Sequence, residues 1–409
     1  MPEHAKFTED MIKTHTILVP DMLPVHFKLL ISIFEAKGYK MELLQNDSRA
    51  VVDEGLKNVH NDACYPALLV IGQFMDALKS DKYDVDKTAL LITQTGGGCR
   101  ASNYIHMLRK CVAKNFPQIP VVSLNFSGLE KDSAFKITAG MFLKMLFAVL
   151  YGDLLMSCHN QCRAYEVNAG DSEKILVKWQ NKLGAIFKSG SREYLKTKKL
   201  YRQILDDFAA VKRSGEKKIR VGIVGEIYVK YSPLANNHLE DFLISEGCEP
   251  VVPALMEFVM YCIAGSLNDA KIYDNKTGKT TAFAIAYKLI YSKQKQLIKV
   301  MKEHGVFEPL HDFEHIRHLA DKYSNQGVVM GEGWLIPAEM AALAETGVEN
   351  IICAQPFGCL PNHIVAKGMA RAIKEGFPNA NIVAIDYDPG ATRVNQENRI
   401  KLMLANARR

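Results

Sequence analysis

The sequence predicts an α/β protein in which a helical connector joins two doubly wound domains, each built on a parallel sheet. Strand-like and helix-like runs alternate in the first part of the chain, the alternation returns near the C-terminus, and a polar, basic stretch separates the two parts. Such alternation is typical of a parallel sheet with helices on both faces. We place the first domain at 1–165, the connector at 166–217 and the second domain at 218–409.

The expected strands of the first domain are short apolar runs, and a helix-like run follows each of them. These strands are HTILVPDM, YKMELLQ, TALLIT and IPVVSLNF. The helices are FKLLISIFEAKG, CYPALLVIGQFMDALKS, YIHMLRKCVAKNF and the long run AFKITAGMFLKMLFAVLYGDLLM. Gly38 ends the first helix, and Pro66 stands in the first turn of the second, where proline is tolerated.

The second domain shows the same pattern. KIRVGIVGEIY is a buried type of strand that ends in a loop, and the chain closes with two strands and two helices. In chain order these are ENIICAQP, HIVAKGMARAIKEGF, ANIVAIDYDPG and NQENRIKLMLANA. No short-period repeat or low-complexity segment occurs, and a duplicated α/β half is not visible as sequence identity.

Composition excludes several classes of protein. The 409 residues are 48% apolar and 23% charged, which is ordinary for a globular protein. No run approaches about 18 apolar residues, so we expect no membrane span. The N-terminus is polar and lacks an apolar signal region, so we expect a cytoplasmic protein.

The net charge of +6 is unevenly spread, because residues 171–220 alone carry fourteen Lys and Arg against six acidic residues. A solvated helical connector is the favoured interpretation of this stretch. Few aromatic residues lie among its charges, which argues against a nucleic-acid partner.

The nine cysteines are not expected to form disulfides, because no secretory signal is present, and they include no C-x-x-C pair. Cys111 and Cys262 lie inside helix-like runs, where we expect core or incidental positions and no ligand role. Two closely spaced pairs stand out: Cys158 with Cys162, and Cys353 with Cys359.

The stretch TQTGGGCRASNY, residues 94–105, joins a strand to a helix and places Cys99 at the helix start. Free backbone N–H groups and the helix dipole favour an anion at that point. Three interpretations are open. The glycines cradle a phosphate, they make room for an inorganic cofactor that Cys99 holds, or they form a tight turn beside a small buried hydrophobe. For a cysteine in isolation the third is favoured.

Other candidate residues also lie at strand ends or helix starts, where open parallel sheets bind their ligands. Cys64 opens a helix, Cys359 follows the strand ending in AQP, and Glu226 and Tyr228 follow the strand VGIV. Three such cysteines, far apart in sequence, can converge across a cleft between the two domains.

Several familiar motifs are absent or weak. No G-K-[ST] follows the glycines, and GIVGE has too few glycines for a dinucleotide fingerprint. The histidines between His311 and His318 lack the H-E-x-x-H spacing, so solvated helix histidines are favoured over a metal site. Asp386 and Asp388 fit either a Mg²⁺ site or a turn that begins at Asp-Pro-Gly.

Four thiolates are the usual shell of a cubane iron–sulfur cluster. A cluster needs space, a close backbone and N–H donors to its sulfides. Gly96, Gly97 and Gly98 would offer all three. Three cysteines on one cubane would leave one iron open to a substrate or another ligand.

Five motifs together resemble the 2-hydroxyacyl-CoA dehydratase superfamily, and more narrowly its branch of double-cubane cluster proteins. They are HNDACYPALLVIGQF, TQTGGGCRASNYIHMLRK, GEIYVKYSPLANNHLEDFL, AQPFGCLPNHIVAKGM and IDYDPGATRVNQENRIKLML. They occur in the same order, and the resemblance extends from about residue 7 to 406.

The resemblance implies iron–sulfur cubanes in the inter-domain cleft, a homodimer, and a separate ATP-dependent iron–sulfur reductase that supplies electrons. In the dehydratases each subunit gives three cysteines to one 4Fe–4S cubane, and Cys64, Cys99 and Cys359 match these by motif. The double-cubane branch holds an 8Fe–9S unit with six thiolates. The further three would be Cys353, Cys158 and Cys162.

We therefore expect an iron–sulfur reductase component of the double-cubane type that acts on a small molecule. A dehydratase subunit with a single 4Fe–4S cluster and a non-catalytic electron-storage or scaffold protein are the alternatives. Arg100 and Asn103 are expected to donate hydrogen bonds around the cluster. Glu226, Tyr228 and Lys230 are expected to line the substrate side or the proton path.

Overall fold

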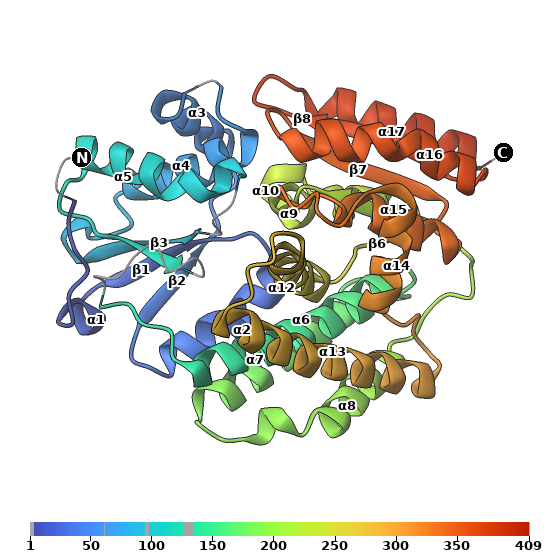
Figure 1. Cartoon of the computed structure of the whole chain (residues 1–409), viewed down its shortest axis with the longest axis horizontal. Helices are drawn as coiled ribbons and strands as arrows, with labels where there is room; N and C mark the ends of the chain where they lie inside the picture. The colour runs from blue at the N-terminus through green and yellow to red at the C-terminus, as the bar shows by residue number, and fades with distance from the viewer. Residues whose placement is uncertain (1–3, 61, 95–97, 126–133, 409) are drawn as a thin grey trace.

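The computed structural model describes residues 4–60, 62–94, 98–125 and 134–408 and contains two sheets, each of four parallel strands. Figure 1 shows the first sheet to the left, the second sheet to the upper right, and a layer of helices below and between them. The predicted fold class, two doubly wound parallel sheets with a helical connector, is confirmed.

The first sheet has the strand order β2-β1-β3-β4, and all four strands fall on the predicted runs. The strands are β1 (Thr16–Pro20), β2 (Lys40–Leu44), β3 (Thr88–Gln94) and β4 (Val121–Asn125). In the register, Thr16 faces Lys40 on one side and Thr88 on the other.

Helices precede, separate and follow these strands along the chain. They are α1 (Met11–Thr14), α2 (Pro24–Glu35), α3 (Arg49–Asn58), α4 (Tyr65–Leu78), α5 (Tyr104–Asn115) and α6 (Ala139–Arg163), with 3₁₀ turns η1 (Val85–Lys87) and η2 (Arg100–Asn103). The connector then forms α7 (Asp171–Lys188), the 3₁₀ turn η3 (Glu193–Leu195) and α8 (Thr197–Ala209). Residues 166–217 are thus mostly helical, as predicted.

The second sheet has the order β6-β5-β7-β8. Its strands are β5 (Ile219–Gly225), β6 (Cys248–Val251), β7 (Asn350–Pro356) and β8 (Asn381–Tyr387). Sequence reasoning did not find β6, because it is a four-residue edge strand that contains a proline, and both features weaken the strand pattern.

The helices of the second part are more numerous than the sequence pattern indicates. They are α9 (Ile227–Tyr231), α10 (Pro233–Asn236), α11 (Leu239–Ser245), α12 (Leu255–Ile272), α13 (Gly278–His304), α14 (Phe313–Tyr323), α15 (Leu335–Glu345), the π-helix η4 (Asn362–Ala366), α16 (Lys367–Gly376) and α17 (Arg393–Ala407). The four helices from α12 to α15 stand between β6 and β7, and α12 and α13 join the lower helical layer in Figure 1.

The two sheets share one topology, although no sequence identity reveals it. In each sheet, the first strand lies between the second and the third. The chain therefore adds its second strand on one side of the first and its third strand on the other side. Such a switch point opens a crevice beyond the carboxyl ends of the two central strands. The two switch points lie after β1 and β3 and after β5 and β7.

Helix α6 departs from the expectation that no segment is long and apolar enough to span a membrane. It is the one helix among the described residues that meets this test, with a mean hydropathy of 1.6 over an 18-residue window. Because 78% of that window is buried inside the protein, α6 packs as a core helix.

A buried carboxylate ties the first part of the chain to the second. Asp153 in α6 accepts a hydrogen bond from His26 in α2 at 2.8 Å and bonds from the backbone N–H groups of Leu255 and Met256 at 2.8 and 3.1 Å. Both Asp153 and His26 are fully buried. The carboxylate thereby satisfies N–H groups at the start of α12, which have no partner within their own helix.

Helices α3 and α4 approach closely because Gly55 of α3 and Gly72 of α4 face each other. A Cβ atom at Gly72 would lie 2.1 Å from the carbonyl oxygen of Val51. We expect Gly72→Ala to lower the free energy of unfolding by about 1–3 kcal/mol, because two helix backbones must separate. Urea unfolding followed by circular dichroism measures the change.

The matched control is Gly368→Ala in α16, where a Cβ atom would meet nothing within 4 Å. There the lost backbone entropy of glycine is the dominant effect, and we expect stability to rise by about 0.5–1 kcal/mol. Equal effects of the two substitutions would contradict the packing argument.

Candidate functional site

Three loops that carry predicted cysteines meet between the two sheets. Cys64 immediately precedes α4, Cys99 follows β3, and Cys359 follows β7. The backbone N–H of Tyr65 donates to the carbonyl oxygen of Phe357 at 3.0 Å, which joins the first loop to the third. The structure therefore brings the loops of Cys64 and Cys359 together, although they belong to different parts of the chain.

Glycine allows this close approach. A Cβ atom at Gly358 would lie 3.1 Å from Cα of Cys64 and 3.5 Å from a guanidinium nitrogen of Arg100, and Gly358 has a φ of +74°. A side chain here would meet the backbone at the start of α4 and strain its own backbone. Arg100 also donates to the carbonyl oxygen of Asp62, so it links the second loop to the first.

A fourth segment, between α14 and α15, closes around the second and third loops. A Cβ atom at Gly98 would lie 2.9 Å from the sulfur of Met330, and one at Gly331 would lie 2.8 Å from the ring of Pro361. Gly96 and Gly97 lie outside the described residues, so the predicted role of the three glycines is described only for Gly98.

The three thiols are shielded from water and remain protonated at neutral pH. Cys64 and Cys359 are 5% and 8% exposed, and Cys99 is half-buried. Burial raises the pKa of Cys64 and Cys359 and brings that of Cys99 to about 11. Cys64 shares a 2.7 Å hydrogen bond with the hydroxyl of Tyr104. Three buried thiols of this kind ionise only if a cation compensates their charge.

Two carboxyl groups, half-buried Glu226 and buried Glu332, share the start of α9, beside the thiols. Glu226 accepts from the N–H of Val229 at 2.9 Å, and Glu332 accepts from the N–H of Ile227 at 2.9 Å. Burial, with repulsion from Glu332, raises the pKa of Glu226 to about 8. Both carboxylates also raise the pKa values of Cys99 and Cys359.

Sequence reasoning found Glu226 but missed Glu332. The available signal was weak, because Glu332 lies between two glycines in VVMGEGW, outside any strand end. Both flanking glycines have positive φ, which marks the segment as a tight turn that carries a buried acidic side chain.

Cys353 joins the site through an amide that the sequence analysis did not select. The side chain of Asn362, fully buried in η4, donates to the sulfur of Cys359 at 3.2 Å. The Cys353 thiol in turn lies 3.7 Å from the Asn362 carbonyl oxygen. Burial raises the pKa of Cys353 to about 12.

Cys158 and Cys162 lie elsewhere, fully buried in α6. The Cys162 thiol donates to the carbonyl oxygen of Phe208 at the end of α8, and the positive charge of Arg213 lies near both sulfurs. Their described contacts are with α8 and the end of the connector, so the six predicted thiols are not gathered at one point.

Cys111 and Cys262 differ in burial in the structure. Cys111 is buried and donates to the carbonyl oxygen of Asn58 at 3.0 Å, as expected for a structural cysteine. Cys262 is exposed on α12, so of the two expected positions, core and incidental, it takes the incidental one. Its apolar neighbours in sequence point inward, whereas its own position falls on the outer side of the helix.

The remaining predicted residues take different positions. Tyr228 is buried near Glu226, and burial together with the charges of Asp21 and Glu226 raises its pKa. Lys230 is 1% exposed and forms an ion pair with Glu339 at 2.9 and 3.2 Å. Asn103 is exposed at the end of η2.

The structure also bears on the two other motifs, the aspartates after the last strand and the histidines between His311 and His318. Asp388 accepts from the N–H groups of Gly390 and Ala391 at 2.7 and 2.9 Å, which is the turn interpretation. His315 forms an ion pair with Glu345 at the surface, and burial lowers the pKa of His311 to about 4.

Asp21 is a further acidic group that sequence reasoning missed. It follows β1, the strand whose position in the first sheet matches that of β5, which Glu226 follows, in the second. Burial, partly opposed by the charge of Lys28, raises the pKa of Asp21 to about 7. Each switch point therefore carries one carboxyl group with a raised pKa.

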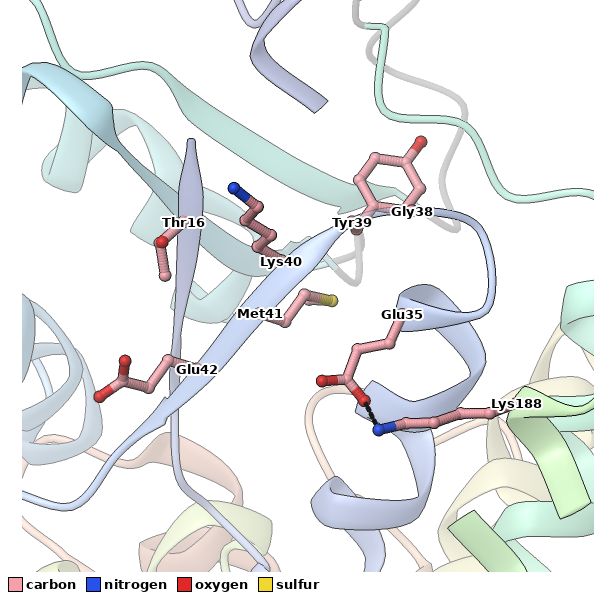
Figure 2. Close-up of a pocket in the computed structure, with 8 residues that line it drawn as sticks. All are labelled: Thr16, Glu35, Gly38, Tyr39, Lys40, Met41, Glu42 and Lys188. Atoms are coloured by element: carbon pink, nitrogen blue, oxygen red, sulfur yellow. Dashed lines mark ion pairs between the residues drawn. The ribbon is translucent and has the colours of Figure 1, made fainter. Parts of the chain in front are cut away.

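Two hollows on the described surface differ in where they lie: one is far from the cysteine loops, and the other reaches Cys353. Figure 2 shows the larger, about 510 Å³, at the amino ends of β1 and β2, where Lys188 pairs with Glu35 at 2.7 Å. That end of the sheet is opposite to the cysteine loops. The second, about 290 Å³, reaches Cys353 between α15, α16 and β8.

Among the described residues, no three His, Cys, Asp or Glu side chains are grouped so that they could hold a single metal ion. A cubane makes a different demand, because each thiolate binds a separate iron and the sulfurs stand further apart. Three thiols on three loops, beside two carboxylates that favour a cation, are donors of the kind that such a group uses. The donors available at this point are Cys64, Cys99 and Cys359, with Cys353 next to them.

No protein-family model matches the chain, and no curated protein matches it. The family resemblance therefore stays a prediction carried by the five sequence motifs.

The raised pKa of Glu226 predicts a pH-dependent stability. The unfolded chain releases this proton near 4.5 and the folded chain near 8, so the contribution of the protonated group is fully present below about 4.5 and is lost as the pH rises to about 8. In the metal-free chain we expect Glu226→Gln to flatten this fall in the free energy of unfolding. Urea titrations across that pH window measure it, and an unchanged slope would contradict the burial of Glu226.

The geometry of Lys230 predicts a structural role. Lys230→Met leaves Glu339 buried without its partner, and we expect a loss of about 3–5 kcal/mol in the free energy of unfolding. The double variant Lys230→Met/Glu339→Gln removes the unpaired charge and should recover most of the loss. If the single variant keeps wild-type stability in urea, the ion pair does not hold the fold.

Proposed function

We propose that the chain is an iron–sulfur protein that accepts single low-potential electrons from a separate ATP-dependent reductase and delivers them to a small substrate. The observation that carries the proposal is the meeting of the Cys64, Cys99 and Cys359 loops between the two sheets. It agrees with the motif resemblance to the 2-hydroxyacyl-CoA dehydratase superfamily.

The electrostatics of the site support a cationic cofactor. Buried thiols surrounded by carboxylates are costly to ionise without a positive charge, and iron supplies that charge. A bound cubane would provide one-electron chemistry at an iron that the three cysteines leave free.

The geometry favours the single-cubane form over the double-cubane form. The loops of three cysteines meet, a fourth thiol follows through Asn362, and the remaining pair contacts α8 and the end of the connector. An 8Fe–9S unit would need Cys158 and Cys162 to reach the same point. The double-cubane reductase is therefore the second candidate, and the sequence resemblance favours it.

Residues around the thiols have defined tasks in this proposal. The Tyr104 hydroxyl and the Asn362 amide donate hydrogen bonds to sulfur, which stabilises negative charge there. Arg100 lies beside the Cys64 loop, and its positive charge partly opposes the burial that raises the pKa of Cys64. Glu226 is protonated at neutral pH and can deliver its proton to a substrate that takes up electrons.

The proposal also includes an electron donor, a subunit partner and a cellular location. An ATP-dependent iron–sulfur reductase is the expected electron donor, a second copy of the chain the expected subunit partner, and the cytoplasm the expected location. A dehydratase subunit acting on a CoA thioester and a non-catalytic electron store remain as alternatives.

The decisive measurement is the iron and sulfide content of chain that is reconstituted without oxygen. We expect about four irons per chain for one cubane and about eight for a double cubane. Cys64→Ala, Cys99→Ala and Cys359→Ala should each lose most of the iron and the brown absorbance. Cys111→Ser is the matched control, since its thiol bonds a backbone carbonyl in the core, and it should keep the full content.

Cys158→Ala/Cys162→Ala separates the two forms further. Unchanged iron in this variant supports the single cubane, and loss of half supports the double form. Full iron in Cys99→Ala would contradict both. Turnover of any small substrate with the reductase present excludes the electron store.

A further inference from the structure

The positive charge of the protein is concentrated on one face made by three helices. Residues 171–209, from α7 to the end of α8, carry a net charge of +4, and α13 carries six lysines against one glutamate. Because the whole chain has a net charge of only +6, the remainder carries −3. The charge is therefore separated into a basic region and an acidic remainder.

Side-chain contacts join the three helices into one layer, which Figure 1 shows at the lower side of the molecule. Lys178 of α7 pairs with Asp207 of α8 at 2.7 Å. Arg202 of α8 pairs with Glu303 of α13 at 3.2 Å, and Thr197 bonds Gln296 at 2.8 Å. Sequence segments about a hundred residues apart thus contribute to the same basic face.

Many cations on this basic face have no acidic side chain as a partner in the described part of the chain. All are exposed, and they come from α7, α8 with the residue before it, and α13. They are Lys182, Lys196, Lys198, Lys199, Lys288, Lys295 and Lys302. Like charges at such density repel one another, so the face lowers its free energy when an anionic surface covers it.

The features of the face favour an acidic protein over a nucleic acid. Single-stranded nucleic acid stacks on several exposed aromatic rings, yet Phe283 is the one exposed aromatic side chain on the described α7, α8 and α13, whereas Trp179 and Tyr201 are buried. Exposed apolar side chains do lie among the cations, namely Val177, Leu195 and Leu289. Lysines with interspersed apolar contacts suit a folded acidic surface.

A second copy of this chain does not suit the face either. A two-fold dimer through it would place the same lysines opposite each other. Pairing it with the acidic remainder of another copy gives a head-to-tail contact that does not close. We propose that the face formed by α7, α8 and α13 is the docking surface for a different protein with an acidic surface.

The test uses the full chain and fluorescein-labelled poly-L-glutamate as the acidic probe, with fluorescence anisotropy as the readout. Lys198→Glu/Lys302→Glu reverses two unpaired cations on the face. The control Lys110→Glu/Lys114→Glu makes the same change in net charge on exposed α5. We expect the dissociation constant to rise about tenfold in the first variant and less than about twofold in the second.

Lys198→Gln/Lys302→Gln provides a milder variant should charge reversal disturb folding, and it should weaken binding by about threefold. Wild-type affinity should fall as the salt concentration rises. Equal weakening by the face and control variants would overturn the proposal, because net charge alone would then explain binding. Tighter binding of an oligothymidylate or of phosphatidylserine vesicles than of poly-L-glutamate would also overturn it. The iron content of the chain, which tests the proposed function, does not depend on these outcomes.

Discussion

The direction of the parallel strands is the constraint on which the rest of the structure depends. In a parallel sheet every strand delivers the chain to the same edge, so the loops after the strands collect there. Two sheets of identical order repeat this arrangement, and their central strands end at Asp21, Cys99, Glu226 and Cys359 or just before them. The candidate site is the consequence of two switch points that face one another, rather than of any local motif.

Burial then sets the chemistry of the groups that collect there. Water would solvate thiolates and carboxylates, but between the sheets the neutral forms are favoured, which raises the pKa values of Cys99, Glu226 and Asp21. A cationic cofactor reverses this preference for the thiols. The same burial makes Lys230 structural, since its charge is compensated by Glu339.

The helical layer below the sheets has two separate tasks. Its inner side holds the two parts of the chain together, where Asp153 caps α12 and binds His26. Its outer side carries the separated positive charge. The stabilising contacts lie on α2, α6 and α12 and the lysines on α7, α8 and α13, so lysines can accumulate on the outer side without disturbing the core.

The sequence by itself determined the fold class, seven of the eight strands and the cysteine loops, because apolar periodicity and Gly-rich strand ends are local signals. Only the tertiary structure decided which residues meet. Cys158 and Cys162 have a suggestive spacing, but their helix packs against α8. Glu332 and Asn362 have no distinctive local pattern, and they reach the site because turns far apart in sequence pack together. Contacts of that kind depend on the packing of whole sheets, which a single sequence does not display.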